Sequence, residues 1–525
     1  MKKNYFKLVV ATGCLILSMA SCTNKLDLLP TNDITSEQVY KTADGYKLAF
    51  AKVYGSFALT GNNGPAGNRD ILAIADEGFS DFLRLYWCAQ ELSTDEAVVA
   101  WGDAGLPDFH KMNWTSNNPF IKGLYYRSFY QITLCNDFIR QSSDAKLAER
   151  GITGADADNI RRYRAEARFL RAFQYSVLMD LFGKPAFITD ETAIGAALPT
   201  QKSRTELFNY IESELKAIES QLAAPRSNEY GRADKAAAWA LLARIYLNAQ
   251  VYTGTPKFAE AATYSKMVID VPGYQLLNNY SRLMRADNHI NNTEAILTIN
   301  YDGVKTQNWG GTTFITHAAV GGNMTVSEFG IDYAWGGTRV TKNIPNLFTA
   351  GDNRAQFFTG NNGIEINDIG DFKDGYAVTK FKNVTATNAA GSNLTWVDID
   401  FPLFRLAEQY LIYAEAVKRG NNVGSEATAI GYLNLLRQRA FGNASGNINS
   451  YTVDYILDER GRELYWEGFR RTDLIRFGKF TEDTYLWPWK GDVKNGKGVE
   501  SWRKVYPIPA DDINSNPNLT QNPNY

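Results

Sequence analysis

Apolar residues recur at helical spacing in several segments of the chain. Between residues 161 and 181, alanine and phenylalanine side chains share one helix face, and this pattern ends at the breaker Gly183-Lys184-Pro185. The same periodicity predicts helices over residues 204–222, 235–251, 258–269, 403–419 and 426–441. Because amphipathic helices of this kind usually pack into a core, we interpret them as scaffold. The chain is predicted to be mainly α-helical.

One predicted helix pair has a distinctive packing pattern. Large, large, small and large residues occupy positions i, i+3, i+4 and i+7, namely Trp239, Leu242, Ala243 and Tyr246. After a break at Gly254, a second helix follows over residues 258–269 and stops at Pro272. The small alanine lets the paired helix approach closely, so the segment resembles a tetratricopeptide helix hairpin.

Residues 60–118 and 286–400 have a different pattern. They are rich in Gly, Asn, Thr and Trp, and they contain short β-like runs such as Ala295–Ile299. Long irregular loops on a rigid helical scaffold are where binding sites commonly lie. We therefore expect a loop-rich, partly β binding face built from these two segments.

The N-terminus has the features of a secretory signal. Basic residues precede an apolar run over residues 8–19, which is too short to span a membrane. Residues 19–21 (Met-Ala-Ser) directly precede Cys22, similar to a bacterial lipobox, in which the cysteine becomes the lipidated first residue. The alternative is an ordinary signal peptide with a coincidental cysteine. We predict a signal over 1–21, a lipid-anchored tether over 22–36 and a single domain over 37–525.

Composition narrows the classes of function. Lys and Arg number 55 against 57 acidic residues, a net charge of −2, so no basic excess favours a nucleic-acid partner. Three His and four Cys cannot form a zinc cluster with the usual spacing, and we expect no required cofactor. Aromatic residues reach 13%, which suits a surface that stacks on apolar ligand faces. Cys88 and Cys135 are predicted to be free buried thiols, with a disulfide as the alternative.

The segment 459–471 is the most enzyme-like part of the sequence. Glu459, Glu463 and Glu467 have i, i+4, i+8 spacing, which predicts one helix stripe of carboxylates and suggests glycoside hydrolysis. Four arginines alternate with these residues, however, so ion-paired carboxylates with lowered pKa values are the favoured interpretation.

Three tryptophans in the irregular segments stand beside glycines: Trp101, Trp309 and Trp335. Glycine neighbours leave an indole face open, and a pyranose ring has an apolar C–H face that stacks on such a surface. Asp76 and Arg84 lie upstream and could bind sugar hydroxyls at the rim. The alternative is that each tryptophan is part of the core.

Several motifs resemble those of a known family: EARFLRA at 166–172, GRADKAA at 231–237, PLFRLAE at 402–408, DLIRFG at 473–478, and YPIP at 506–509 with QNPNY at 521–525. These are similar to the SusD/RagB outer-membrane lipoproteins, and segments 302–311 and 485–491 most resemble its starch-binding member. The resemblance implies a SusD-like fold, an array of four tetratricopeptide-like helix pairs with a loop-rich carbohydrate-binding face. It also implies glycan binding without hydrolysis and a TonB-dependent transporter of the SusC kind as partner.

The resemblance also assigns candidate site residues. It carries an aromatic arc onto Trp101, Trp309 and Trp335, with Asp76 and Arg84 as polar contacts. Trp309 stands where the starch binder has a tyrosine, and Asp103 is a substitute for an asparagine of that protein. A calcium site is implied at Asp398, Asp400 and Asp287, and a solvated pair of loop carboxylates is the alternative.

These observations support one main hypothesis and three alternatives. The main hypothesis is a lipoprotein of the outer membrane, facing the cell exterior, that captures starch or malto-oligosaccharides for a SusC-like transporter. The alternatives are a SusD-like binder of another polysaccharide, a glycoside hydrolase, and a tetratricopeptide scaffold that binds only protein.

Overall fold

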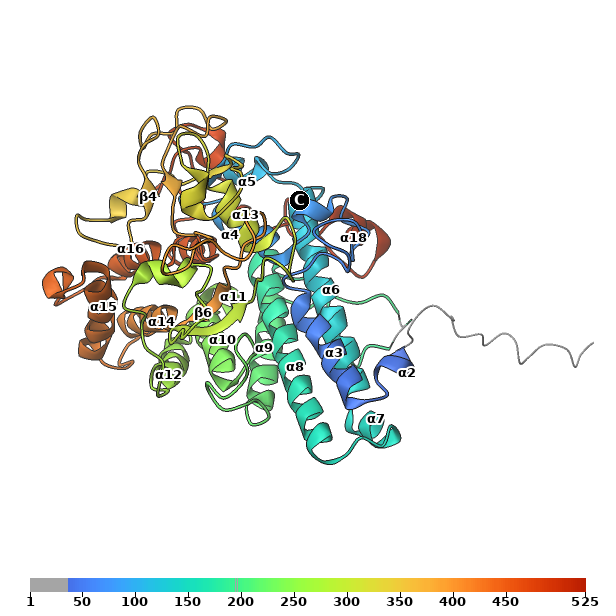
Figure 1. Cartoon of the computed structure of the whole chain (residues 1–525). Coiled ribbons are helices and arrows are strands. Elements are labelled where there is room, and N and C mark those ends of the chain that lie inside the picture. The colour runs from blue at the N-terminus through green and yellow to red at the C-terminus, as the bar shows by residue number, and fades with distance from the viewer. Residues whose placement is uncertain (1–35, 194, 196) are drawn as a thin grey trace, which may run out of the picture.

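The structure, a computed structural model, describes residues 36–193, 195 and 197–525 (Figure 1). Long helices form an array along the lower part of the view, and strong contacts join α6 to α8, α8 to α9, α10 to α12, and α12 to α14. The array comprises α3 (Ala43–Gly55), α6 (Pro119–Gln141), α8 (Gly154–Phe182), α9 (Arg204–Ile218), α10 (Lys235–Leu247), α12 (Phe258–Ile269), α14 (Leu406–Arg419), α15 (Glu426–Phe441) and α16 (Val453–Leu464). Shorter helices are α2 (Ser36–Val39), α4 (Phe82–Glu91), α5 (Asp108–Lys111), α7 (Asp144–Glu149), α11 (Ala249–Thr253), α13 (Gly311–Ala318), α17 (Arg470–Arg476) and α18 (Ala510–Ser515).

The predicted helices are present, with corrections at some ends. α12 and α15 coincide with the predicted ranges 258–269 and 426–441, and α8 ends before Gly183, whose φ of 73° suits glycine. The prediction of a helix from residue 403 is wrong at its start, because residues 401–405 form a strand. The predicted helix 235–251 is divided at Asn248 into α10 and α11.

The loop-rich segments are held by three small antiparallel strand pairs. β2 (Ala295–Ile299), predicted from its apolar run, pairs with β6 (Phe401–Arg405). β1 (Val98–Val99) pairs with β3 (Thr338–Arg339), and β4 (Phe357–Phe358) pairs with β5 (Ala377–Val378). The prediction of irregular loops and short β-like runs in these segments is wrong for α4 and α13, which are helices that pack on each other. Every residue of α13 is buried, so it lacks the polar face that periodicity analysis detects.

One apolar core connects the array to the loop-rich segments. Phe173 of α8 contacts Phe82 of α4 and Phe404 of β6, with ring centroids 6.3 and 6.0 Å apart. Cys88 and Cys135 are buried in this core as free thiols, as predicted, and burial raises the pKa of each to about 12. Within the described part of the chain, no helix has the length and apolar character needed to cross a membrane.

A buried ionic network joins the array to the loop-rich segments. Arg405, at the end of β6, pairs with Glu294, Glu463 and Glu467 at 2.6–2.8 Å. Arg354 pairs with Glu463 at 3.1 Å, and further pairs extend the network to Glu459, Asp352, Lys380 and Arg439. A buried charge is tolerated only when it is paired, so these side chains must all be in place together.

The ion pairs of this network test the two interpretations of segment 459–471, namely hydrolase carboxylates and ion-paired structural carboxylates. The predicted ion pairing of its carboxylates is confirmed, although most of the partners come from elsewhere in the chain. The predicted single stripe is wrong for Glu467, because α16 ends at Leu464 and Trp466 has a φ of 65°. Burial opposes ionisation of Glu459, but Arg354 and its neighbours outweigh it and lower the pKa to about 2.

This lowered pKa predicts acid sensitivity. A glutamate whose pKa is 4.5 when unfolded and about 2 when folded stabilises the protein above pH 4.5, and this contribution is lost as the pH falls toward 2. At about 1.36 kcal/mol per pKa unit, the contribution is about 3 kcal/mol. Denaturant unfolding of Glu459→Gln should therefore show lower stability at pH 7 and a smaller further loss on acidification than the unmodified protein shows.

Glu149→Gln is the matched control, because the ion pair of Glu149 with Lys146 lies at the surface. It should match the unmodified protein at every pH. An equal acid-induced loss in the Glu459 variant and the unmodified protein would contradict the assigned pKa.

Candidate functional site

A strand pair brings two of the tryptophan loops together. In the β1–β3 pair Val99 lies opposite Thr338, and the Ala100 N–H donates to the Gly337 carbonyl at 2.8 Å. Because the strands are antiparallel, Trp101 just after β1 meets Trp335 just before β3. The Trp101 Nε1–H donates to the Trp335 carbonyl at 3.2 Å, and the ring centroids are 6.2 Å apart.

Trp309 completes the group from the loop before α13. Its ring centroid lies 6.2 Å from that of Trp335, and the two planes are tilted by 49°. The planes of Trp101 and Trp335 are tilted by 46°. Each of the three side chains is only partly buried. The structure therefore assembles the three predicted residues, here called the tryptophan cluster, at the surface of the loop-rich segments.

The predicted rim residues lie beside this cluster and also shape it. Arg84 on α4 donates to the carbonyls of Trp309 and Gly78 at 3.1 and 2.9 Å, so it fixes the Trp309 loop. Burial lowers the pKa of Arg84, while the carboxylates of Asp103 and Asp76 act in the opposite direction. Both aspartates are exposed and could accept hydrogen bonds from a ligand. Their contact with a ligand stays a prediction.

Sequence reasoning missed His317, which packs against the cluster on its buried side. His317 of α13 is fully buried, and its ring stacks on Trp335 with centroids 4.9 Å apart. Its Nδ1 lies 2.8 Å from the Tyr333 carbonyl, and its Nε2 lies 2.9 Å from the Thr395 carbonyl. His317 thus joins the Trp335 loop to segment 391–398. No signal in the sequence links residues so far apart.

The three aspartates predicted to bind calcium hold two different loops, because Asp398 and Asp400 both accept from residues 301–303 whereas Asp287 accepts from residue 386. Asp398 accepts from the Gly303 N–H at 2.7 Å, Asp287 accepts from the Ala386 N–H at 3.0 Å, and burial raises the pKa of Asp400 to about 7. Across the described residues, no group of three or more His, Cys, Asp or Glu side chains is placed to hold a metal ion. These residues do not fit a single calcium site, so binding there stays a prediction that the geometry does not favour.

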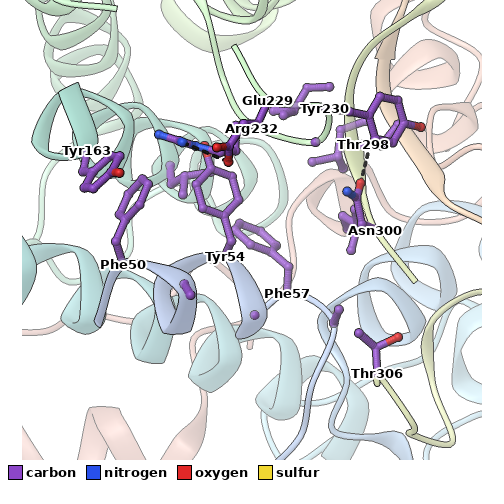
Figure 2. Close-up of a pocket in the computed structure, with 18 of the residues that line it drawn as sticks. Phe50, Tyr54, Phe57, Tyr163, Glu229, Tyr230, Arg232, Thr298, Asn300 and Thr306 are labelled. Carbon is purple, nitrogen blue, oxygen red and sulfur yellow. Dashed lines mark hydrogen bonds and ion pairs between the residues drawn. The ribbon is translucent and has the colours of Figure 1, made fainter. Parts of the chain in front are cut away.

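A separate cavity of about 320 Å³ lies between α3, α8, β2 and the loop at 229–232 (Figure 2). Phe50 and Phe57 contribute to its apolar lining, and Arg232 stands at its edge. Arg232 is already paired with Glu166 and Glu229. None of the three tryptophans lines this cavity. Its paired ionic groups bind each other, and the other polar groups of its lining include Thr298, Asn300 and Thr306.

Comparison with known proteins identifies the family. A profile described as the SusD family matches residues 349–525, and one described as "Starch-binding associating with outer membrane" matches residues 92–247. The chain is 37% identical to the starch-binding protein SusD of Bacteroides thetaiotaomicron, with 100% of both chains covered. The chain belongs to the SusD family. A SusD-like protein of Bacteroides ovatus is 23% identical over 91% of this chain and 83% of its own.

Solved structures confirm the SusD-like, mainly helical fold. Surface glycan-binding protein A of Bacteroides fluxus matches with a TM-score of 0.70 at 22% identity, over 92% of this chain and 100% of its own. The protein of the same name from Bacteroides thetaiotaomicron, solved in complex with laminarihexaose, matches with a TM-score of 0.68 at 22% identity, over 91% of this chain and 99% of its own.

The Trp101 ring packs closely against Gly337, and this contact provides a test of the cluster's geometry in this SusD-family chain. A Cβ added at Gly337 would lie 2.4 Å from the Trp101 ring, so Gly337→Ala must displace that ring. We expect Gly337→Ala to weaken ligand binding about tenfold, as loss of one aromatic contact does, measured by calorimetry with malto-oligosaccharides.

Gly431→Ala on α15 is the control, because a Cβ there meets no atom within 4 Å. It should bind like the unmodified protein. Unchanged affinity in the Gly337 variant would show that the position of Trp101 does not matter for binding.

Proposed function

We propose that this SusD-family protein is a cell-surface glycan-binding lipoprotein that captures starch or malto-oligosaccharides by aromatic stacking. The observation that carries the proposal is the tryptophan cluster, which presents three partly exposed indoles within 6.2 Å of their neighbours. The full-length relative that is 37% identical is named a starch-binding protein, and a structural neighbour was solved with laminarihexaose, so the family binds glycans.

The tilt between the rings favours a curved ligand. The ring plane of Trp335 is tilted by 46° from that of Trp101 and by 49° from that of Trp309. A flat ligand therefore cannot stack on all three faces at once. An α-1,4-glucan is curved, so its successive apolar sugar faces also point in different directions. A ligand already curved in solution loses less conformational freedom when it binds. Arg84, Asp76 and Asp103 supply polar groups at the edge for the sugar hydroxyls.

The protein binds glycan without cleaving it. The carboxylates that suggested a hydrolase are buried and ion-paired, and the basic residues beside Glu459, Glu463 and Glu467 outweigh the effect of burial and lower each pKa. A general acid for glycoside hydrolysis needs a raised pKa and access to substrate. The exposed indoles also favour glycan binding over a scaffold that binds only protein, because such a scaffold needs no stacking surface.

The proposal includes lipid attachment and a partner. Lipidation at Cys22 and the tether up to residue 35 lie outside the described residues, and they rest on the lipobox-like sequence. A family profile described as associating with the outer membrane supports that location. A tether of about 14 residues spans at most ~50 Å, so the body would stay near the membrane. Such confinement raises the effective concentration of the protein body near a SusC-like TonB-dependent transporter.

Ligand shape tests the proposed specificity. Cyclic malto-oligosaccharides should bind at least as tightly as linear ones of similar length, because their curvature already exists in solution. Cellohexaose, which is straight, should show no measurable binding by calorimetry. Comparable affinity for cellohexaose would overturn the starch assignment and leave glycan binding in place.

The anchor has its own test. Cys22→Ala should yield unlipidated protein that is absent from the cell surface and does not support growth on starch polymers. Its affinity for starch in vitro should be unchanged, because the substitution lies outside the binding face. Surface exposure and normal growth of this variant would contradict both the anchor and the role beside the transporter.

A further inference from the structure

Trp396 lies next to the tryptophan cluster and was not among the residues predicted from the sequence. Its ring centroid is 5.6 Å from that of Trp309. Resting on the proposed function, we propose that Trp396 is a fourth stacking position that extends the binding surface and makes it selective for longer glycans.

The geometry of the four rings is regular. Along the row Trp101, Trp335, Trp309 and Trp396, successive centroids are 6.2, 6.2 and 5.6 Å apart. The angles between the planes of neighbouring rings are 46°, 49° and 53°. Trp396 therefore has a spacing and a tilt from its neighbour similar to those within the cluster. A ligand that follows the first three rings would reach the fourth with its next sugar units.

The backbone on both sides of Trp396 is held firmly. The Trp396 N–H donates to Asn393 Oδ1 at 3.1 Å, and the Val397 N–H donates to Thr313 Oγ1 at 3.1 Å. The Thr395 carbonyl contacts Nε2 of His317, the residue that also supports Trp335. These contacts fix the backbone at Trp396 relative to the cluster before a ligand binds. Less conformational entropy is therefore lost on binding.

The indole of Trp396 differs from the structural tryptophans of this protein. The buried residues Trp87, Trp114 and Trp466 each donate their Nε1–H to an oxygen acceptor. Among the residues that the structure describes, none accepts a hydrogen bond from the covered Trp396 Nε1, and the side chain stays partly exposed. Packing on Trp309 therefore orients its ring, and no hydrogen bond ties the ring to the core. The partly exposed side chain leaves the ring accessible for contact with a ligand.

The position of Trp396 at the end of the row predicts dependence on ligand length. A short oligosaccharide on Trp101, Trp335 and Trp309 does not reach the fourth ring, whereas a longer one does. Loss of Trp396 should weaken binding of maltooctaose about fivefold or more and leave maltotriose binding unchanged, because a peripheral contact contributes less than a central anchor. Loss of Trp335, at the centre, should weaken the binding of both.

The experiment is calorimetry of the mature protein with maltotriose and maltooctaose. The variants are Trp396→Ala, Trp396→Phe, Trp335→Ala and Trp239→Ala, the last being a matched tryptophan loss on α10 that should change neither affinity. Trp396→Phe retains a stacking ring and should recover most of the maltooctaose affinity. Melting temperatures are measured in parallel, so that a folding defect is distinguished from a lost contact.

Each outcome decides the proposal. A loss confined to maltooctaose, recovered by phenylalanine, supports a fourth stacking position. Equal losses for both oligosaccharides would show that Trp396 acts only by supporting Trp309, and no loss would show that it takes no part; either result overturns the proposal. If the unmodified protein binds neither sugar, the proposed function itself fails, and that result is separate from any effect of the variants.

Discussion

The ion pairs of Arg405 are the constraint on which the architecture depends. Arg405 is the last residue of β6 and directly precedes α14, so it stands where the loop-rich segments join the helix array. Its guanidinium binds Glu294, Glu463 and Glu467, and all four side chains are at most 1% exposed. Removing one member would leave a buried charge without a partner, at a cost of about 3–5 kcal/mol. Because every pair must form together, the network fixes how the loop-rich segments sit on the helix array.

The proposed binding surface is built on that junction. β6 holds β2, and α13 packs on α4, which carries Arg84. The β1–β3 pair then places Trp101 beside Trp335, while His317 connects the Trp335 loop to the segment that carries Trp396. Loops that contain little regular structure are therefore fixed by a few buried polar contacts on a rigid scaffold. This arrangement keeps the aromatic faces partly exposed and reduces the conformational entropy that would be lost on ligand binding.

Much of the scaffold could be predicted from the sequence, because amphipathic helices such as α12 and α15 show their apolar face directly. The strand at residues 401–405 was missed, since a short apolar run is compatible with a helix or a strand until its partner is known. α13 was missed because all of its residues are buried. In the site, glycine neighbours revealed the three tryptophans. His317 and Trp396 could not be found this way, because their contacts join segments about 80 residues apart and depend on the tertiary fold.

The most direct test of the central claim is a crystal structure of the protein with maltoheptaose. We predict glucose rings stacked on Trp101, Trp335 and Trp309, with sugar hydroxyls bonded to the polar side chains beside them. Maltoheptaose bound elsewhere, for example in the cavity between α3 and α8, with the tryptophan cluster unoccupied, would contradict the account.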